Sequence, residues 1–186
     1  VESYRRIRNT LRFLLANLAD FDLARGALPV DDWLEIDRYA WVMTCDLQQA
    51  LAPSEHGAKQ PAPGHYGNYE FHIVAQKLQT FCSEDLGGFY LDILKDRLYT
   101  APAASRVRRS AQNALYHITQ SLTRLLAPIL SFTAQEVWET LDGGEASVFE
   151  QTWYEFPQPR DAEELRARWQ KLRALRSDVQ RQLEAL

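Results

Sequence analysis

The stretch SRVRRSAQNALYHITQSLTRLLAPI, at residues 105–129, decides the fold. Its apolar residues recur every three or four positions, which places them on one face of an α-helix. Ser105 is a residue type that caps helix N-termini, and Pro128 closes or kinks a helix, so both ends are marked. The face that we expect to point inward consists of Val107, Ala111, Leu115, Ile118, Leu122, Leu125 and Ile129.

The same spacing recurs on the N-terminal side of this segment. It predicts helices over residues 1–18, from about 33 to 51, over 71–81 and over 86–98. The pair Gly87-Gly88 interrupts the last two. Because glycine weakens a helix, the pair indicates a bend or a close approach of two helices.

The C-terminal part of the chain has weaker and more varied patterns. Thr133 and Glu136 have the spacing of a capping box, which predicts a short helix ending at Gly143-Gly144. Residues 145–158 lack a helical period and are expected to run extended across the bundle. Asp161 then begins a last helix with near-heptad apolar spacing. Its stripe consists of Leu165, Trp169, Leu172, Leu175, Val179, Leu183 and Leu186.

These segments together predict an all-α fold. We expect a bundle of about five to six helices, with a short extended segment before the last one. The bundle covers residues 1–158 and includes a mobile loop at 53–67, which is rich in Pro and Gly. Residues 159–186 form the C-terminal helix, which packs on the bundle or leads to a missing C-terminal domain.

Composition excludes several classes of protein. With 186 residues, 46% of them apolar, and a net charge of −4, the chain is neither disordered nor collagenous. Its two cysteines, Cys45 and Cys82, make neither a disulfide scaffold nor a CxxC zinc pair. No apolar run is long enough to cross a membrane. The first residue is Val1, so we expect a piece of a longer protein.

Positive charge is concentrated in a chain that is acidic overall. Residues 1–12 carry four arginines and one glutamate, and Arg5, Arg8, Asn9 and Arg12 share one helical face. Like charges at these spacings repel, so an anion is a better explanation of that face. Arg binds phosphate bidentately, and Asn can read a base edge. The alternative is a solvated face that binds nothing.

A second basic segment covers residues 95–124. It predicts phosphate contacts for Lys95, Arg97 and Arg109, and base stacking for Tyr99. Cations at a helix end also satisfy terminal carbonyls, and an aromatic residue in such a run is often core. Both interpretations stay open for these four residues.

The sequence contains no pattern of catalytic residues. Its histidines lack metal-binding spacing, and neither a glycine-rich phosphate loop nor a paired Glu-x-x-His motif is present. Cys82 has no signature of a nucleophile, and Asp92 lies beside Lys95, as in a surface ion pair. We therefore expect no catalytic residue, no metal and no bound cofactor.

Several segments resemble a known family. These are YRRIRNTLRFLLANLADFD at 4–22, LEIDRYA at 34–40, NYEFHIVAQKLQTFCSEDLGGFYLDILKDRLYT at 68–100, LLAPILSFTAQEVWE at 125–139, SVFEQTWYEFP at 147–157 and RWQKLRALRSDVQRQLE at 168–184. They resemble the anticodon-binding domain of isoleucyl-tRNA synthetases, which are class I enzymes. LLAPILSFTAQEVW is also similar to the valyl, leucyl and methionyl types.

The resemblance implies a helical bundle behind a catalytic domain, in a cytoplasmic enzyme, that binds the anticodon stem-loop of isoleucine tRNA. The parent enzyme uses ATP and magnesium, but the HIGH and KMSKS signatures, the editing domain and the cysteine-rich zinc tail are not in this sequence. The fragment is therefore expected to be inactive alone, with tRNA and the parent's catalytic domain as partners.

Two alternatives remain open at this point. One is a helical-bundle module that binds another protein, and the heptad-like spacing of the last helix favours it. The other is the anticodon domain of a valyl- or leucyl-type relative. The tRNA hypothesis itself requires that the arginines near the N-terminus lie exposed to solvent and not beneath neighbouring carboxylates.

Overall fold

The computed structural model describes residues 2–52, 63–143 and 146–184. Within these ranges all regular structure is helical and no strand is present, so the predicted all-α class is confirmed. The elements in chain order are α1 (Glu2–Leu18), α2 (Leu23–Gly26), η1 (Val30–Asp32), α3 (Glu35–Leu51), α4 (Gly64–Gly67), α5 (Phe71–Thr80), η2 (Phe81–Tyr90), α6 (Leu91–Thr100), α7 (Arg106–Leu126), α8 (Ser131–Asp142), η3 (Val148–Glu150) and α9 (Ala162–Glu184).

Helix α7 is the central element of the bundle. Helices α1, α3, α6 and α8 all pack against it. The predicted inward residues from Ala111 to Leu125 are fully buried, whereas Val107 is 38% exposed because it lies in the first turn, at the end of the bundle. The Ser105 hydroxyl accepts a hydrogen bond from the Arg108 amide, and the helix ends before Pro128, as predicted.

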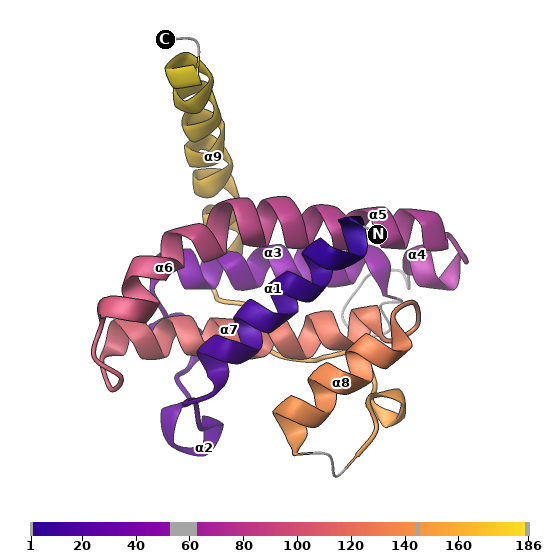
Figure 1. Ribbon diagram of the computed structural model, residues 1–186. Coiled ribbons are helices and arrows are strands. Elements are labelled where there is room, and N and C mark those ends of the chain that lie inside the picture. The colour runs from indigo at the N-terminus through magenta and orange to yellow at the C-terminus, as the bar shows by residue number, and fades with distance from the viewer. Residues whose placement is uncertain (1, 53–62, 144–145, 185–186) are drawn as a thin grey trace.

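Helices α5, η2 and α6 follow one another without a break, as Figure 1 shows. Residues 81–90 form a π-helix, whose wider turns accommodate the Gly87-Gly88 pair, so the helical backbone continues from α5 into α6. The Gly88 carbonyl accepts a hydrogen bond from the Arg176 guanidinium of α9 at 3.1 Å. A Cβ added at Gly87 or Gly88 would meet only carbonyl oxygens of η2 itself, so the glycine pair does not mark the close approach of another helix that the sequence offered as one explanation.

Helix α9 is attached to the bundle from its first turn as far as Arg176. Leu165 is 1% exposed, and the Trp169 ring stacks on Tyr39 of α3, with 5.2 Å between centroids. Farther along, α9 projects beyond the bundle (Figure 1). The apolar stripe of α9 packs on the bundle only as far as Trp169, because no described helix covers the exposed residues Leu172, Leu175, Val179 and Leu183.

The predicted capping box of α8 is also wrong. The helix begins at Ser131 with no side-chain cap, so Thr133 already lies inside its first turn. The Thr133 hydroxyl is hydrogen-bonded instead to the Tyr4 hydroxyl of α1, at 3.1 Å. The other end agrees with the prediction, because Gly143 has a φ of 75° and closes the helix.

The segment before α9 lies against the core. After the short η3 helix the backbone is irregular, and Trp153, Tyr154 and Phe156 pack on buried residues. Of the predicted mobile loop, residues 53–62 lie outside the described ranges. Residues 64–67 form the single turn α4, held by a hydrogen bond from the Tyr66 hydroxyl to the Leu125 carbonyl, so this part is ordered against α7.

Candidate nucleic-acid interface

Helix α1 carries a row of exposed polar side chains. Its buried face contains Ile7, Leu11 and Leu14, among others, and this amphipathic pattern turns Arg5, Asn9 and Arg12 outward. The Arg5 side chain is 66% exposed and reaches Glu2 only at 3.7 Å. Arg12 has no ion pair with any described residue. We call Arg5, Asn9 and Arg12 the α1 ridge.

Arg8 departs from the prediction. Its guanidinium donates two hydrogen bonds to Glu136 of α8, at 2.9 and 3.0 Å, and a third to the Tyr4 hydroxyl at 3.3 Å. The hydrogen bond to Glu136 raises the pKa of Arg8, and bonds from Thr133 and Arg8 lower the pKa of Tyr4. A bidentate pair fixes the guanidinium, so Arg8 is neutralised rather than free for phosphate.

Arg97 has a structural partner, which stands against its predicted role as a phosphate contact. Its guanidinium is paired with the carboxylate of Asp37, which is completely buried, and the Arg97 side chain is only 17% exposed. Asp37 also accepts hydrogen bonds from the hydroxyls of Tyr90 and Ser110. Burial raises the pKa of Asp37, and the charge of Arg97 opposes that rise. This network joins α3, η2, α6 and α7.

The remaining predicted residues lie on α6 and in the first turn of α7. Lys95 and Tyr99 are one turn apart on α6, where Lys95 pairs with Asp92 at 2.9 Å and Tyr99 is 68% exposed rather than core. Arg109 is half-buried, donates to Gln112 at 3.1 Å and lies over the Phe21 ring. Each of the two cations is therefore already engaged.

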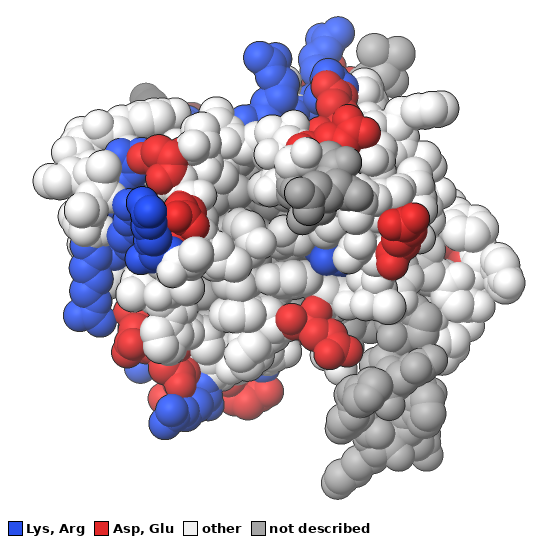
Figure 2. Space-filling view, turned by 90° about the horizontal axis from the view of Figure 1, so that it is seen from below, with Lys and Arg blue, Asp and Glu red and all other residues white. Residues whose placement is uncertain are grey.

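The structure thus places the predicted residues on α1, on α6 and at the start of α7. Helix α1 begins beside α5 and runs across the bundle toward α2 and α7 (Figure 1). Figure 2 shows Lys and Arg gathered at the upper edge and along the left side of one face, each group next to Asp or Glu. Between the groups lies a broad uncharged area. On this face the positive charge is therefore divided rather than continuous.

Sequence reasoning missed three residues beside the ridge. Tyr4, Phe132 and Glu136 lie where α1 meets α8, and Phe132 is 93% exposed. Tyr4 falls within the predicted helix over residues 1–18, and Glu136 within the predicted capping box. The available signal was that Phe132 falls outside the apolar period of α8, whose inward residues are Ala134, Val137 and Trp138.

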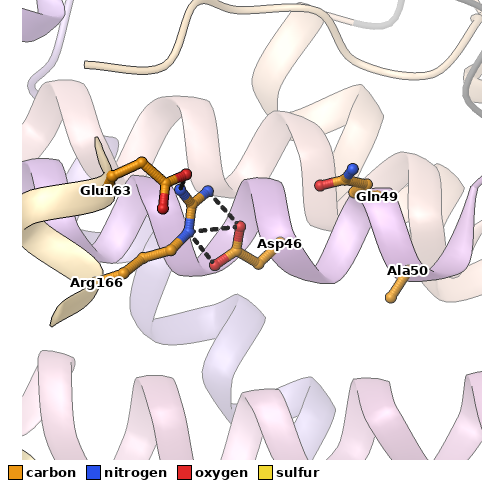
Figure 3. Close-up of a pocket in the computed structure, with 5 residues that line it drawn as sticks. All are labelled: Asp46, Gln49, Ala50, Glu163 and Arg166. Carbon is orange, nitrogen blue, oxygen red and sulfur yellow. Dashed lines mark hydrogen bonds and ion pairs between the residues drawn. The ribbon is translucent and has the colours of Figure 1, made fainter. Parts of the chain in front are cut away.

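An open depression lies between α3 and α9, and its lining does not favour a ligand. Asp46, Gln49, Ala50, Glu163 and Arg166 line it, between α3 and α9 (Figure 3). Arg166 reaches Asp46 at 2.6 Å and Glu163 at 2.7 Å, so its charge is already compensated. The depression marks where α9 is fastened to α3.

The buried titratable groups do not form a reactive cluster. Burial raises the pKa of both Cys45 and Cys82 to about 12, which keeps the thiols protonated. Burial lowers the pKa of His117 to about 4, where its ring stacks on Phe156 and bonds the Tyr154 hydroxyl. Among the described residues no group of three His, Cys, Asp or Glu side chains is arranged to hold a metal.

None of the described helices is both long enough and apolar enough to span a membrane.

Comparison with known proteins then assigns the chain to a family. Residues 56–185 match the model of the anticodon-binding domain of tRNA ligase.

Curated relatives agree over nearly all of the chain. An isoleucine–tRNA ligase of Burkholderia vietnamiensis is 57% identical over 98% of this chain, and one of Thiobacillus denitrificans is 57% identical over 100% of it. One of Cupriavidus taiwanensis is 55% identical. The chain spans 18 to 19% of the length of these three proteins. The chain therefore belongs to the family of anticodon-binding domains of tRNA ligases.

Proposed function

We propose that this chain binds the anticodon stem-loop of isoleucine tRNA, as the RNA-recognising part of an isoleucine–tRNA ligase. The observation that carries the proposal is the α1 ridge, in which Arg5 and Arg12 lie exposed on a domain of this family. The three relatives named above all carry isoleucine in their names, which favours isoleucine tRNA over the valine and leucine alternatives.

The ridge offers two kinds of contact. Arg5 and Arg12 are suited to backbone phosphates, because an exposed guanidinium gives up little hydration before it pairs. Asn9 lies between them on the same face and can donate to and accept from a base edge. Arg8 contributes indirectly, because its pair with Glu136 holds α8 beside the ridge.

The proposal assigns no cofactor and no catalytic residue to this chain. ATP, magnesium and the ligation reaction belong to the remaining part of the parent enzyme, and the cytoplasm is the compartment that this function implies. The catalytic domain of the parent is the proposed second partner. The isolated chain is therefore expected to bind tRNA without charging it.

Salt-titrated binding tests the proposal. Two phosphate contacts to a single-stranded loop contribute about −1.4 to the slope of log K against log salt, at roughly 0.7 per contact. We expect the double variant Arg5→Gln/Arg12→Gln to lose about that much slope and to bind more weakly. Arg25→Gln is the matched control, because the Arg25 side chain is 89% exposed on α2 and lies outside the ridge.

The RNA must also be varied. Wild type should bind the isoleucine stem-loop more tightly than one with an altered anticodon loop. Equal binding to both RNAs, no binding, or a double variant with the wild-type slope would contradict the proposal.

One observation favours a second candidate function, a helical module that binds protein. The exposed apolar residues of α9 lie in a row that no described helix covers. Substitution of Leu175 and Leu183 by Glu distinguishes the two functions. An RNA-binding chain keeps its affinity for the stem-loop in that variant, whereas a protein-binding module loses its protein partner.

A further inference from the structure

Phe132 is placed where it contributes little to folding. Its side chain is 93% exposed, more than any other large apolar side chain in the described ranges. The next two residues of α8, Thr133 and Ala134, are buried, so the helix faces the core on another side. A single exposed apolar residue is common in proteins, and the surroundings of Phe132 must therefore show whether it has a ligand.

Those surroundings combine four polar and aromatic groups on two helices. The Tyr4 hydroxyl of α1 is bonded to Thr133, and the Arg8 guanidinium is bonded to both carboxylate oxygens of Glu136. Phe132 and Glu136 are four residues apart on α8, so they are neighbours on one face of the helix. An exposed ring therefore lies beside a carboxylate whose position is fixed by α1.

Charge divides this surface into two parts. The α1 ridge is positive, whereas the exposed face of α8 carries Glu136 and Glu139. Phosphates are attracted to the ridge and repelled by these carboxylates, so an RNA strand on α1 would turn its bases, not its backbone, toward α8. An unpaired base needs an apolar plane to stack on, and Phe132 supplies one.

Glu136 retains hydrogen-bonding capacity in this arrangement. A carboxylate has about four lone-pair sites, and Arg8 occupies one on each oxygen. The Glu136 side chain is 60% exposed, so the remaining sites are accessible from solvent. As an acceptor only, it suits a base that carries an amino group.

We propose that Phe132 stacks on one unpaired base of the RNA loop whose backbone lies on the α1 ridge, and that Glu136 accepts a hydrogen bond from the amino group of that base. This inference rests on the proposed function. It predicts a preference at one loop position for adenine, cytosine or guanine over uracil, which has no amino group.

The test compares Phe132→Leu and Phe132→Trp with wild type in binding the isoleucine anticodon stem-loop. Leucine keeps an apolar side chain but removes the ring, and we expect affinity to fall between about 5-fold and 150-fold, the range for stacking of one base. Tryptophan keeps a stacking plane and should bind within about 2-fold of wild type. Phe149→Leu is the matched control, because Phe149 is also exposed, at 58%, but lies on η3.

Two further readouts separate stacking from other effects. The salt slope should be the same in all four proteins, because Phe132 carries no charge. A 2-aminopurine base at the stacked loop position should lose fluorescence on binding wild type but not Phe132→Leu. Replacing that loop base by uracil should weaken wild type and leave Glu136→Ala nearly unchanged.

The outcomes are distinguishable. If wild type does not bind the stem-loop, the proposed function fails and this inference fails with it. If wild type binds and Phe132→Leu binds equally well, this inference alone is overturned. A Phe132→Trp protein as weak as Phe132→Leu, or a changed salt slope in either, also overturns it.

Discussion

Replacement of Arg97 by methionine tests its structural role directly. The change keeps an apolar chain of similar reach but removes the cation that faces the fully buried Asp37. Breaking one partner of a buried ion pair typically costs about 3–5 kcal/mol. Because the Arg97 side chain is 17% exposed and Asp37 keeps two hydroxyl donors, we expect the lower end, about 3 kcal/mol of the free energy of unfolding.

The pH dependence follows from the same carboxyl group. Burial raises the pKa of Asp37 and Arg97 opposes that rise, so the variant raises it further. A carboxyl whose pKa is higher in the folded state lowers the stability of the protein as pH rises through that range. The destabilisation by Arg97→Met should therefore be larger at pH 7 than at pH 5.

Urea denaturation of wild type and variant at both pH values measures the effect. Lys95→Met is the matched control, because Lys95 lies on the same helix with its side chain 54% exposed, and we expect no measurable change. The reasoning is refuted if Arg97→Met stays within about 1 kcal/mol of wild type, against the expected cost of a broken buried pair. It is also refuted if the loss is the same at both pH values.

Two other predictions concern stability. Burial lowers the pKa of His117 from 6.5 to about 4, so as the pH falls the imidazole is protonated in the unfolded chain before it is protonated in the folded one. Through this group, the free energy of unfolding of wild type should fall by about 2 kcal/mol between pH 7 and pH 5. In urea denaturation, the free energy of unfolding of His117→Phe should change by that much less than wild type between pH 7 and pH 5. An equal change in both proteins would contradict the role given to His117. Leu165→Ala should cost about 2–4 kcal/mol and Leu175→Ala under about 0.5, since only Leu165 is buried. Equal melting temperatures of the two leucine variants would show that α9 is attached differently.

The fold was largely predictable because it depends on periodicity. The apolar residues of α7 and the first turns of α9 fall inward as their spacing requires. Spacing does not reveal how far a helix extends beyond its neighbours, so it left open whether the stripe of α9 packs on the bundle. It also does not reveal a π-helix, since Gly87-Gly88 reads as an interruption in any helical pattern.

The candidate site was predictable only in part, for an electrostatic reason. The sequence shows that Arg5, Arg8 and Arg12 share a face but not which carboxylates approach them from distant elements. Glu136 is 128 residues from Arg8 in the chain, and Asp37 is 60 residues from Arg97. Such pairs form only when the bundle closes, so burial and charge compensation had to come from the structure.

The C-terminal part of α9 projects from the bundle, so a small change in the angle of the helix displaces its C-terminal end (Figure 1). From Arg176, which bonds the Gly88 carbonyl, to Glu184 it reaches about 12 Å at 1.5 Å per residue, so a tilt of roughly 10° there moves the tip by about 2 Å. Ion pairs to Asp46, Glu35 and Asp85 set its angle. Salt screens such pairs without affecting the apolar core. A change in ionic strength would therefore change the angle between α9 and the bundle, while the apolar core of the bundle keeps its structure.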